Sequence, residues 1–307
     1  MGLFSGIKNV YQSFYSNVID VVYDAWKDVG DWLVDELISK EGPLPDNLLV
    51  NNNDAVSSLP VVYGERRLGG TRVYLVSSGS KNKYLNSILA IAEGAVNGIS
   101  DIEINDKPES AVTSKLRYTK YLGATTQAAD AQFVSELTAW TSEHTLNGVA
   151  YLALRYEYDQ DTYSGLPTAT SLVKGLSLYD PRTATSAYST NYALVVLDYF
   201  RSAVYGVGIT DDSLIDFESF KSSANTADSE YASSVDSEVM VKRFACNTVV
   251  DTSKSPLDNI KELVSESRGF LTNSAGQWRY IIQNDTTSNH TITFDDIVGS
   301  ISRQSNG

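Results

Sequence analysis

The spacing of the apolar residues changes along the chain, and this change limits the fold more than any other sequence feature. In residues 1–41, apolar side chains recur at steps of three and four, which is the period of one face of an α-helix. From residue 59 onward, short runs of β-branched and aromatic residues are separated by Gly, Asn and Pro, a pattern typical of β-strands. The sequence therefore predicts an amphipathic N-terminal helix attached to a β-rich body.

The predicted N-terminal helix carries an apolar stripe that includes Trp26 and Trp32. Six acidic residues with few bases nearby occupy the other side of its second half, which argues against adsorption to an anionic lipid surface. Because a stripe of this size must be covered, three explanations remain open. The stripe packs on a partner helix or in a lumen, which we favour; it belongs to an ordinary core; or the segment at residues 2–7 contacts a membrane.

The rest of the chain divides into a linker and two blocks. Residues 42–58 are rich in Pro, Gly and Asn and show no apolar period, so they predict a linker. Residues 59–185 predict a β-rich block, and residues 186–307 predict a mixed block of helices and strands. The expected fold class is therefore α+β and β-rich.

The first block is expected to hold six strands and one helix. The strands are expected at residues 59–64, 71–76, 83–93, 101–105, 148–158 and 170–179. A turn at Gly69 and Gly70 predicts that the first two strands form a hairpin. The helix is expected at residues 129–141, with Trp140 on its apolar face.

The second block alternates helices and strands. The expected elements are helices at residues 192–204, 213–224 and 256–267, a strand at 239–252, and a strand pair at 270–272 and 277–283. The helix at 256–267 is the best marked, because Ser255 can cap it, Pro256 suits its first position and Asp258 can reach back to the cap. The side chains expected to face inward from this helix are Leu257, Ile260 and Val264.

Composition and charge exclude several classes of function. The 307 residues include 24 Lys and Arg against 38 Asp and Glu, and the net charge of -14 disfavours stable binding to nucleic-acid phosphates. The single cysteine, Cys246, cannot close a disulfide within the chain, and two histidines do not make a zinc site with it. No apolar run reaches the ~18 residues of a membrane span. We expect no cofactor and no metal.

The sequence also lacks the common catalytic motifs. It has no G-x-S-x-G elbow, no glycine-rich phosphate loop and no H-E-x-x-H helix. His144 is expected at the surface or at a helix end, and Cys246 is expected to be a small buried residue rather than a nucleophile. The Asp-Asp pairs at residues 211–212 and 295–296 are expected in solvated turns. We therefore expect a protein that is not an enzyme.

Six groups of short motifs follow one another along the body of the chain. They read LPVVYGERRLGG at residues 59–70, LAIAEG with GI and IND between 89 and 106, TSEHTLNGVAYL at 141–152, GLSLYDPR at 175–182, NYAL with LDY and YGVGI between 191 and 209, and CNTVVDT with NI and RG between 246 and 269. In this order and spacing they resemble the central tail tip proteins of long non-contractile-tailed phages, the lambda-like tip attachment protein J family. Tyr192 and Thr248 stand where that family commonly has proline and glycine.

The resemblance implies a tail hub made of barrel-like β domains with the amphipathic helix at the N-terminus. It implies a homotrimeric ring that caps the tail tube, adapts the six-fold tube to the three-fold tip and surrounds the path of the DNA without binding it specifically. The implied partners are a tail tube or distal tail protein, a tape-measure protein and other tail tip proteins, with the host envelope as a further contact. The implied location is the tail tip of the virion, after synthesis in the host cytoplasm.

Family members run far beyond 307 residues, so we expect either a short hub or the N-terminal portion of a longer one.

The structural or interface candidates are Tyr63, Arg66, Trp140, Tyr179, Asp180, Arg182, Trp26 and Trp32. Arg182 follows a proline in a turn beside Asp180, and we expect it to tie this turn to a neighbouring carboxylate or carbonyl. Two alternatives stay open: a receptor-binding tail tip protein and, less favoured, a tail-associated hydrolase of cell wall or glycan.

Overall fold

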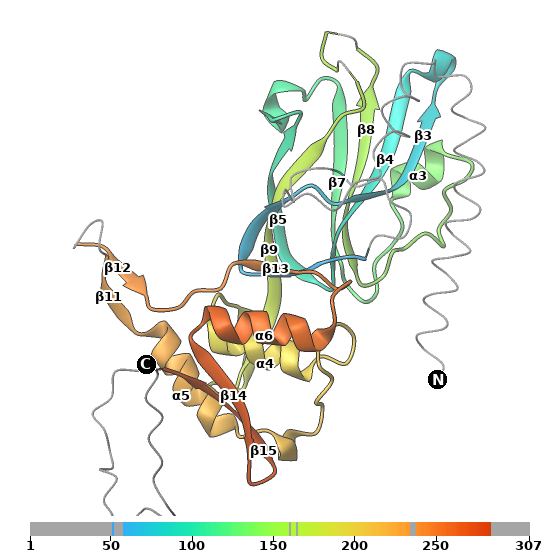
Figure 1. Ribbon diagram of the computed structural model, residues 1–307. Helices are drawn as coiled ribbons and strands as arrows, with labels where there is room; N and C mark the ends of the chain where they lie inside the picture. The colour runs from blue at the N-terminus through green and yellow to red at the C-terminus, as the bar shows by residue number, and fades with distance from the viewer. Residues whose placement is uncertain (1–50, 52–57, 160, 164, 234–237, 284–307) are drawn as a thin grey trace, which may run out of the picture.

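A computed structural model describes residue 51 and residues 58–159, 161–163, 165–233 and 238–283. The predicted N-terminal helix with Trp26 and Trp32, most of the predicted linker and the C-terminal tail lie outside the described residues. The described chain is a β-rich α+β fold, as the sequence predicts. We call residues 58–188 the β-rich region and residues 191–283 the helical region (Figure 1).

Two antiparallel sheets build the β-rich region. The four-stranded sheet has the order β3 (Thr71–Ser78), β4 (Tyr84–Glu93), β8 (Val149–Glu157) and β7 (Leu116–Leu122). The five-stranded sheet has the order β10 (Thr185–Tyr188), β9 (Ala169–Asp180), β5 (Val96–Ile104) and β6 (Lys107–Pro108), and β2 (Glu65–Leu68) also pairs with β9. The expected barrel-like shape is present as a half-barrel, because within the described residues no strand pairing joins the two sheets.

Alternation along the strands gives each face of the four-stranded sheet its own core. Leu89 and Ile91 of β4 face the five-stranded sheet and pack with residues of β5 and β9. The intervening Ile88 faces the opposite side, where it packs with Phe133 of α3 (Ala131–Glu136) and with Trp140. The helix therefore covers the outer face of this sheet (Figure 1).

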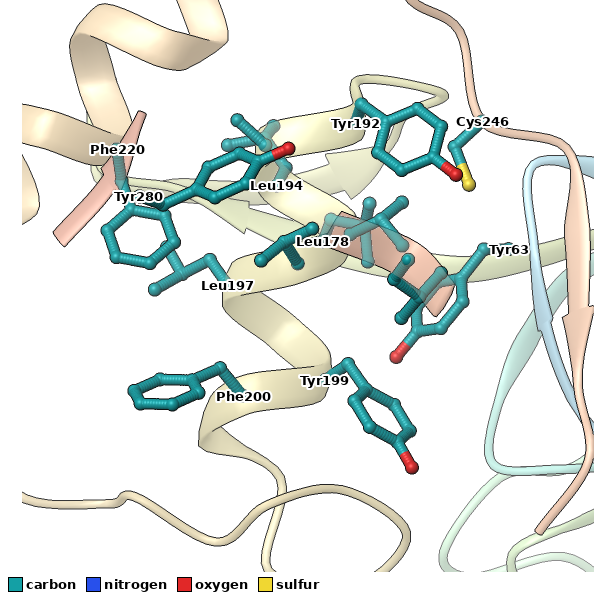
Figure 2. Packing of buried hydrophobic residues seen from close by; sticks show 14 of the residues in the cluster. Tyr63, Leu178, Tyr192, Leu194, Leu197, Tyr199, Phe200, Phe220, Cys246 and Tyr280 are labelled. Carbon is teal, nitrogen blue, oxygen red and sulfur yellow. The ribbon is translucent and has the colours of Figure 1, made fainter. Parts of the chain in front are cut away.

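Three α-helices, one short 3-10 helix (Asp212–Leu214) and two hairpins lie in the helical region. The helices are α4 (Tyr192–Arg201), α5 (Phe217–Asp228) and α6 (Pro256–Glu266), and the hairpins are β11 (Glu230–Ala232) with β12 (Met240–Lys242) and β14 (Gly269–Ser274) with β15 (Gln277–Ile282). Each helix begins at a polar residue whose side chain accepts backbone N–H bonds: Asn191, Asp216 and Ser255. The core also takes in Tyr63 and Leu178 from the β-rich region, and Figure 2 shows both beside α4.

A two-stranded ladder lies between the two regions and is shared by their cores. β1 (Val61–Tyr63) pairs antiparallel with β13 (Thr248–Val250), and we call this pair the seam. Val61 belongs to the core of the helical region, whereas the next residue, Val62, belongs to the core between the sheets. Adjacent strand residues point to opposite faces, so one short strand completes two cores.

β9 crosses the seam at Gly175. A side chain there would place its Cβ 2.0 Å from the carbonyl oxygen of Val62, and the Gly175 N–H donates to the Gly64 carbonyl at 2.7 Å. Before this crossing β9 gives Val173 to the core between the sheets, and after it β9 gives Leu178 to the helical core. Glycine is needed because only its bare backbone permits this approach.

The predicted hairpin around Gly69 and Gly70 is wrong. The first predicted strand becomes β1, which pairs with β13, and the second becomes β3, which pairs with β4. Gly64, with φ of 68°, turns the chain after β1, and Gly70, with φ of 75°, turns it again before β3. Composition identified both strands, but it could not identify partners that lie far away in the sequence.

Other predicted bounds also need correction. The helix expected at 129–141 is only α3, because Leu137 adopts an extended backbone, although Trp140 still reaches the same core. The strand expected at 239–252 is two strands, β12 and β13, with different partners. Leu257 is 60% exposed rather than inward, because the buried residues of α6 begin with Asn259 and Ile260.

Candidate functional site

Within the described residues, Cys246 and His144 are the reactive side chains that the sequence singles out, and both make local structural contacts. In the described ranges, no cluster of three or more His, Cys, Asp or Glu could hold a metal ion. Cys246 is buried, and burial raises the pKa of its thiol to about 12, so the reactive thiolate is disfavoured. The imidazole Nδ1 of His144 accepts the backbone N–H of Thr141 at 2.9 Å, which makes it part of a local turn.

A partly buried polar cluster lies where the seam meets α4. The hydroxyl of Tyr63 donates to Oδ2 of Asp198 at 2.7 Å, and the hydroxyl of Tyr205 donates to the same oxygen at 2.8 Å. Burial raises the pKa of the Asp198 carboxyl, while the two tyrosine hydrogen bonds and the nearby Arg201 oppose that rise. This one carboxylate oxygen joins a strand, a helix and a loop.

A small cavity of about 260 Å³ lies beside Asp198. Its lining residues are Asp198, Arg201, Ser202, Tyr205 and Thr210. The loop that forms its wall is tied to the end of α4, because the N–H of Val207 donates to the carbonyl of Tyr199 at 3.0 Å. The cavity is therefore part of the same cluster rather than a separate cleft.

A second polar cluster surrounds Arg182 at the end of β9. Its guanidinium bonds both carboxylate oxygens of Asp180, at 2.9 and 2.7 Å, and also contacts Asp228 at 2.9 Å and the Asn225 amide oxygen at 3.1 Å. Lys242 of β12 pairs with Asp228 at 2.7 Å. Arg182 thus ties its turn to the end of α5, a contact of the kind expected from the sequence.

The two carboxylates of the Arg182 cluster are both held ionised. The hydrogen bond from Arg182 lowers the pKa of Asp180 despite partial burial. For Asp228, burial opposes ionisation, but hydrogen bonds from Lys242 and Arg182 outweigh it and lower the pKa. The pKa of Asp198 is therefore shifted up, whereas the pKa values of Asp180 and Asp228 are shifted down.

The candidate residues from the sequence fall at different places. Tyr63 lies in the Asp198 cluster, and Trp140 is buried beneath the four-stranded sheet. Tyr179 is partly exposed, with the Arg201 guanidinium 5.7 Å from its ring centre, close to the Arg182 turn. Arg66 is exposed on β2, opposite Val173.

Sequence reasoning missed Asp198, Tyr205 and Asp228. Asp198 had a detectable signal, since it is the lone acid in the apolar run of α4, where a carboxylate needs polar partners. The other two had none. Asp228 finds its partners in the turn after β9 and on β12, and Tyr205 finds its partner on α4; only the tertiary fold creates these contacts.

Both hairpins of the helical region expose large apolar side chains. Phe270 and Ile281 form a cross-strand pair and are 62% and 47% exposed. Tyr231 and Met240 are 51% and 54% exposed on the β11–β12 hairpin, which extends away from the helices in Figure 1. Where such side chains join into a patch of several hundred Å², they mark a surface that contacts another protein.

Comparison with known proteins relates the fold to a virus-like particle. No protein-family model matches the sequence, and no curated protein is similar to it. The structure is similar to a chain in the virion of a native gene transfer agent (GTA) particle, with a TM-score of 0.50 and 14% sequence identity. The match covers 94% of this chain but 66% of that chain, so this chain spans less than two thirds of its length. Among the described helices, none is long and apolar enough to cross a bilayer.

Proposed function

We propose that this protein is a structural component of a phage-like virion and acts there as a tail hub at the tail tip. The observation that carries the proposal is the fold shared with a GTA virion chain over 94% of this chain. The ordered motifs that resemble the tip attachment protein J family supply the more specific position, which the fold likeness alone does not.

The arrangement of those motifs in space supports the proposal. The motif at residues 59–70 forms β1 and β2, and the motif at 246–252 contains β13, the partner of β1. The motif at 175–182 begins at Gly175, where β9 crosses the seam, and ends at Arg182. Three motifs far apart in the sequence thus meet at one place, as expected if they belong to one ancestral fold.

Surface and charge agree with an assembly role. A ring needs contacts between different patches on neighbouring copies, and the exposed apolar hairpins offer such patches. A net charge of -14 would repel DNA phosphates from a channel wall, so DNA would pass without specific binding. We expect acidic side chains to line the lumen, and an electrostatic map showing a basic wall would contradict this.

The proposed partners follow from the same position. They are two further copies of this chain, a tail tube or distal tail protein, a tape-measure protein contacted by residues 1–41, and other tail tip proteins. Contact of the N-terminal segment with the host envelope is a further proposal. We also propose that the protein is not an enzyme and that it uses no cofactor or metal ion.

Deleting the gene in the producing host tests the proposal. A structural hub predicts particles without completed tails, restored when the intact chain is supplied from a plasmid. Complete, infectious particles in the deletion strain would contradict the proposal. Complete particles that fail only to adsorb would instead favour the receptor-binding alternative.

A further inference from the structure

The two hairpins of the helical region differ in how they are covered. The β14–β15 hairpin buries one side, because Tyr280 and Ile282 lie in the helical core while alternate residues along β15 are exposed. The β11–β12 hairpin buries neither side, since every residue of β11 and two of the three residues of β12 are exposed. We call the β11–β12 hairpin the arm. A two-stranded hairpin on its own is only marginally stable in water, so packing on another surface would stabilise the arm.

Both faces of the arm carry apolar side chains. Tyr231 lies opposite Val241, and the next pair, Ala232 with Met240, points to the other face because neighbouring strand residues alternate. Tyr231 and Met240 are therefore exposed on opposite faces. A surface that covers the arm can bury apolar area on either side of it.

The base of the arm is fixed to the end of α5. Lys242 of β12 pairs with Asp228 at 2.7 Å, and Arg182 holds the same carboxylate at 2.9 Å. The N–H of Arg243 donates to the carbonyl of Ser229 at 2.8 Å. The Arg182 cluster thus holds the arm in one direction, which lowers the entropy cost of packing it on a partner.

The exposed side of the β14–β15 hairpin is apolar at one end. Three cross-strand pairs point outward, and we call them the outer face: Phe270 with Ile281, Thr272 with Arg279, and Ser274 with Gln277. Arg268, which comes just before β14, is also exposed and lies next to the apolar end by the same alternation. The outer face therefore combines large apolar side chains with arginine.

The arm and the outer face carry opposite charge. The outer face holds no acidic residue, although acids outnumber bases by 38 to 24 in the chain, and Arg279 pairs with Asp216 at 2.8 Å from behind it. The arm instead carries the exposed acids Glu230 and Glu238, and its lysine is paired at the base. An acidic apolar arm and a basic apolar face are complementary in both respects.

We propose that the arm of one copy of this chain packs on the outer face of the next copy. The inference rests on the proposed function, since a hub ring places several copies side by side. The two hairpins of one copy point in different directions (Figure 1), so the arm meets the face of a neighbour. Because arm and face are different patches, the contact is head-to-tail and repeats around a ring.

The test measures the oligomeric state of the purified full-length protein by analytical ultracentrifugation. The arm variant is Tyr231→Ser with Met240→Ser, and the face variant is Phe270→Ser with Ile281→Ser. Each should raise the dissociation constant of the oligomer about tenfold or more, because it removes large apolar contacts from one side. All four side chains are exposed, so the circular dichroism spectra should stay those of the wild type.

The matched control is Leu257→Ser, which removes an exposed apolar side chain outside both hairpins and should leave the dissociation constant unchanged. A wild-type chain that stays monomeric at the highest concentration reached would overturn the proposal. So would an arm or face variant that assembles like the wild type, or an equal loss of assembly in Leu257→Ser.

Mixing the two variants tests which surface meets which. The face variant keeps an intact arm, and the arm variant keeps an intact outer face, so the mixture should form a dimer although each variant alone is monomeric. If arms packed on arms, the face variant alone would assemble like the wild type. That result, or a mixture that stays monomeric, would contradict the contact between arm and face.

Charge reversal tests the contact without touching its apolar residues. Arg268→Glu on the face side and Glu230→Lys on the arm should each weaken assembly. A chain that carries both changes should assemble better than either single variant, because the two surfaces attract each other again. Losses that simply add would exclude the charge complementarity on which the proposal depends.

Particles separate the failure of this contact from the failure of the tail-hub role. The arm variant, supplied to the deletion strain, should not restore complete particles. If it restores them while the deletion alone abolishes them, the arm contact is wrong and the tail hub stands. If the deletion leaves complete, infectious particles, the proposed function itself fails, and the arm contact fails with it.

Discussion

The β-rich region and the helical region both bury aromatic cores, but they build them from different contacts. In the β-rich region, neighbouring strands pair over large sequence distances, as where Ile88 of β4 lies opposite Ala153 of β8. In the helical region, each helix starts at its own cap, such as Asn191 or Ser255, and packs afterwards. The first region depends on long-range pairing and the second on local signals.

The seam shows that this difference does not make the regions independent. Val61 and Val62 contribute to different cores, and so do Val250 and its neighbour Val249. Removing β1 would open both cores at once. We therefore expect changes at the seam to destabilise the whole described fold, and changes inside one region to act mainly on that region.

The largest expected effect is that of Gly175→Ala. The added Cβ would meet the Val62 carbonyl at 2.0 Å, and rigid backbone on both sides cannot yield without separating β9 from the seam. We expect a loss of about 5 kcal/mol or more in the free energy of unfolding, measured with urea. Gly98→Ala on β5 is the matched control, since a Cβ there meets nothing within 4 Å. Equal stability of the two variants would disprove the crowding at the seam.

Trp140→Ala should act on one region. The side chain is fully buried and packs edge-to-face on Tyr74 at 4.9 Å between ring centres. We expect the free energy of unfolding to fall by about 3–5 kcal/mol. Amide hydrogen exchange should accelerate first in β3, β4 and β8. Val134→Ala, on the exposed side of α3, should change little. Exchange that accelerates equally in α4 and α6 would show that the regions are not separable.

Ser255→Ala tests the local signals of the helical region. The Ser255 hydroxyl accepts the N–H of Asp258 at 3.1 Å and donates to its carboxylate at 2.7 Å. Removing the hydroxyl should lower the free energy of unfolding by about 1 kcal/mol, measured with urea. The first turn of α6 should also become less protected from amide hydrogen exchange. Ser265→Ala, exposed on the same helix, should be neutral. If Ser265→Ala lowered the stability and Ser255→Ala did not, Ser255 would not be the cap of α6.

Arg182→Lys should have the smallest effect and lower the free energy of unfolding by about 0.5 kcal/mol. Lysine keeps the charge but cannot make the bidentate contact with Asp180. The pKa values of Asp180 and Asp228 are lowered, so their contribution is present above the ordinary Asp pKa of about 3.9 and is lost as pH falls below it. The difference from wild type should therefore be present at pH 7 and vanish in strong acid. Arg268→Lys is the exposed control; a gap that grows in acid would contradict the ion-pair account.

The same contrast explains what could be predicted from the sequence. α6 was predicted within one residue of its bounds, because its cap, proline and apolar spacing lie within the helix itself. β2, with the sequence ERRL, was missed, because it is a strand only through its pairing with β9. The pairing of β1 with β13 had no local signal either.

The candidate site followed the same rule. The contacts of Arg182 with Asp180 could be anticipated because the two residues are neighbours in one turn. The convergence of Tyr63 and Tyr205 on Asp198 could not, since a strand, a helix and a loop must first be packed together. Contacts between neighbouring residues could be predicted from the sequence, whereas contacts that the tertiary fold creates could not.

Cryo-electron microscopy of particles purified from the producing host tests the central claim most directly. A tail hub predicts density that fits the β-rich and helical regions at the tail tip, in three copies around the tail axis. The exposed Phe270 and Tyr231 hairpins would then lie at contacts with neighbouring subunits. Particles that lack this chain, or that carry it away from the tail tip, would contradict the account.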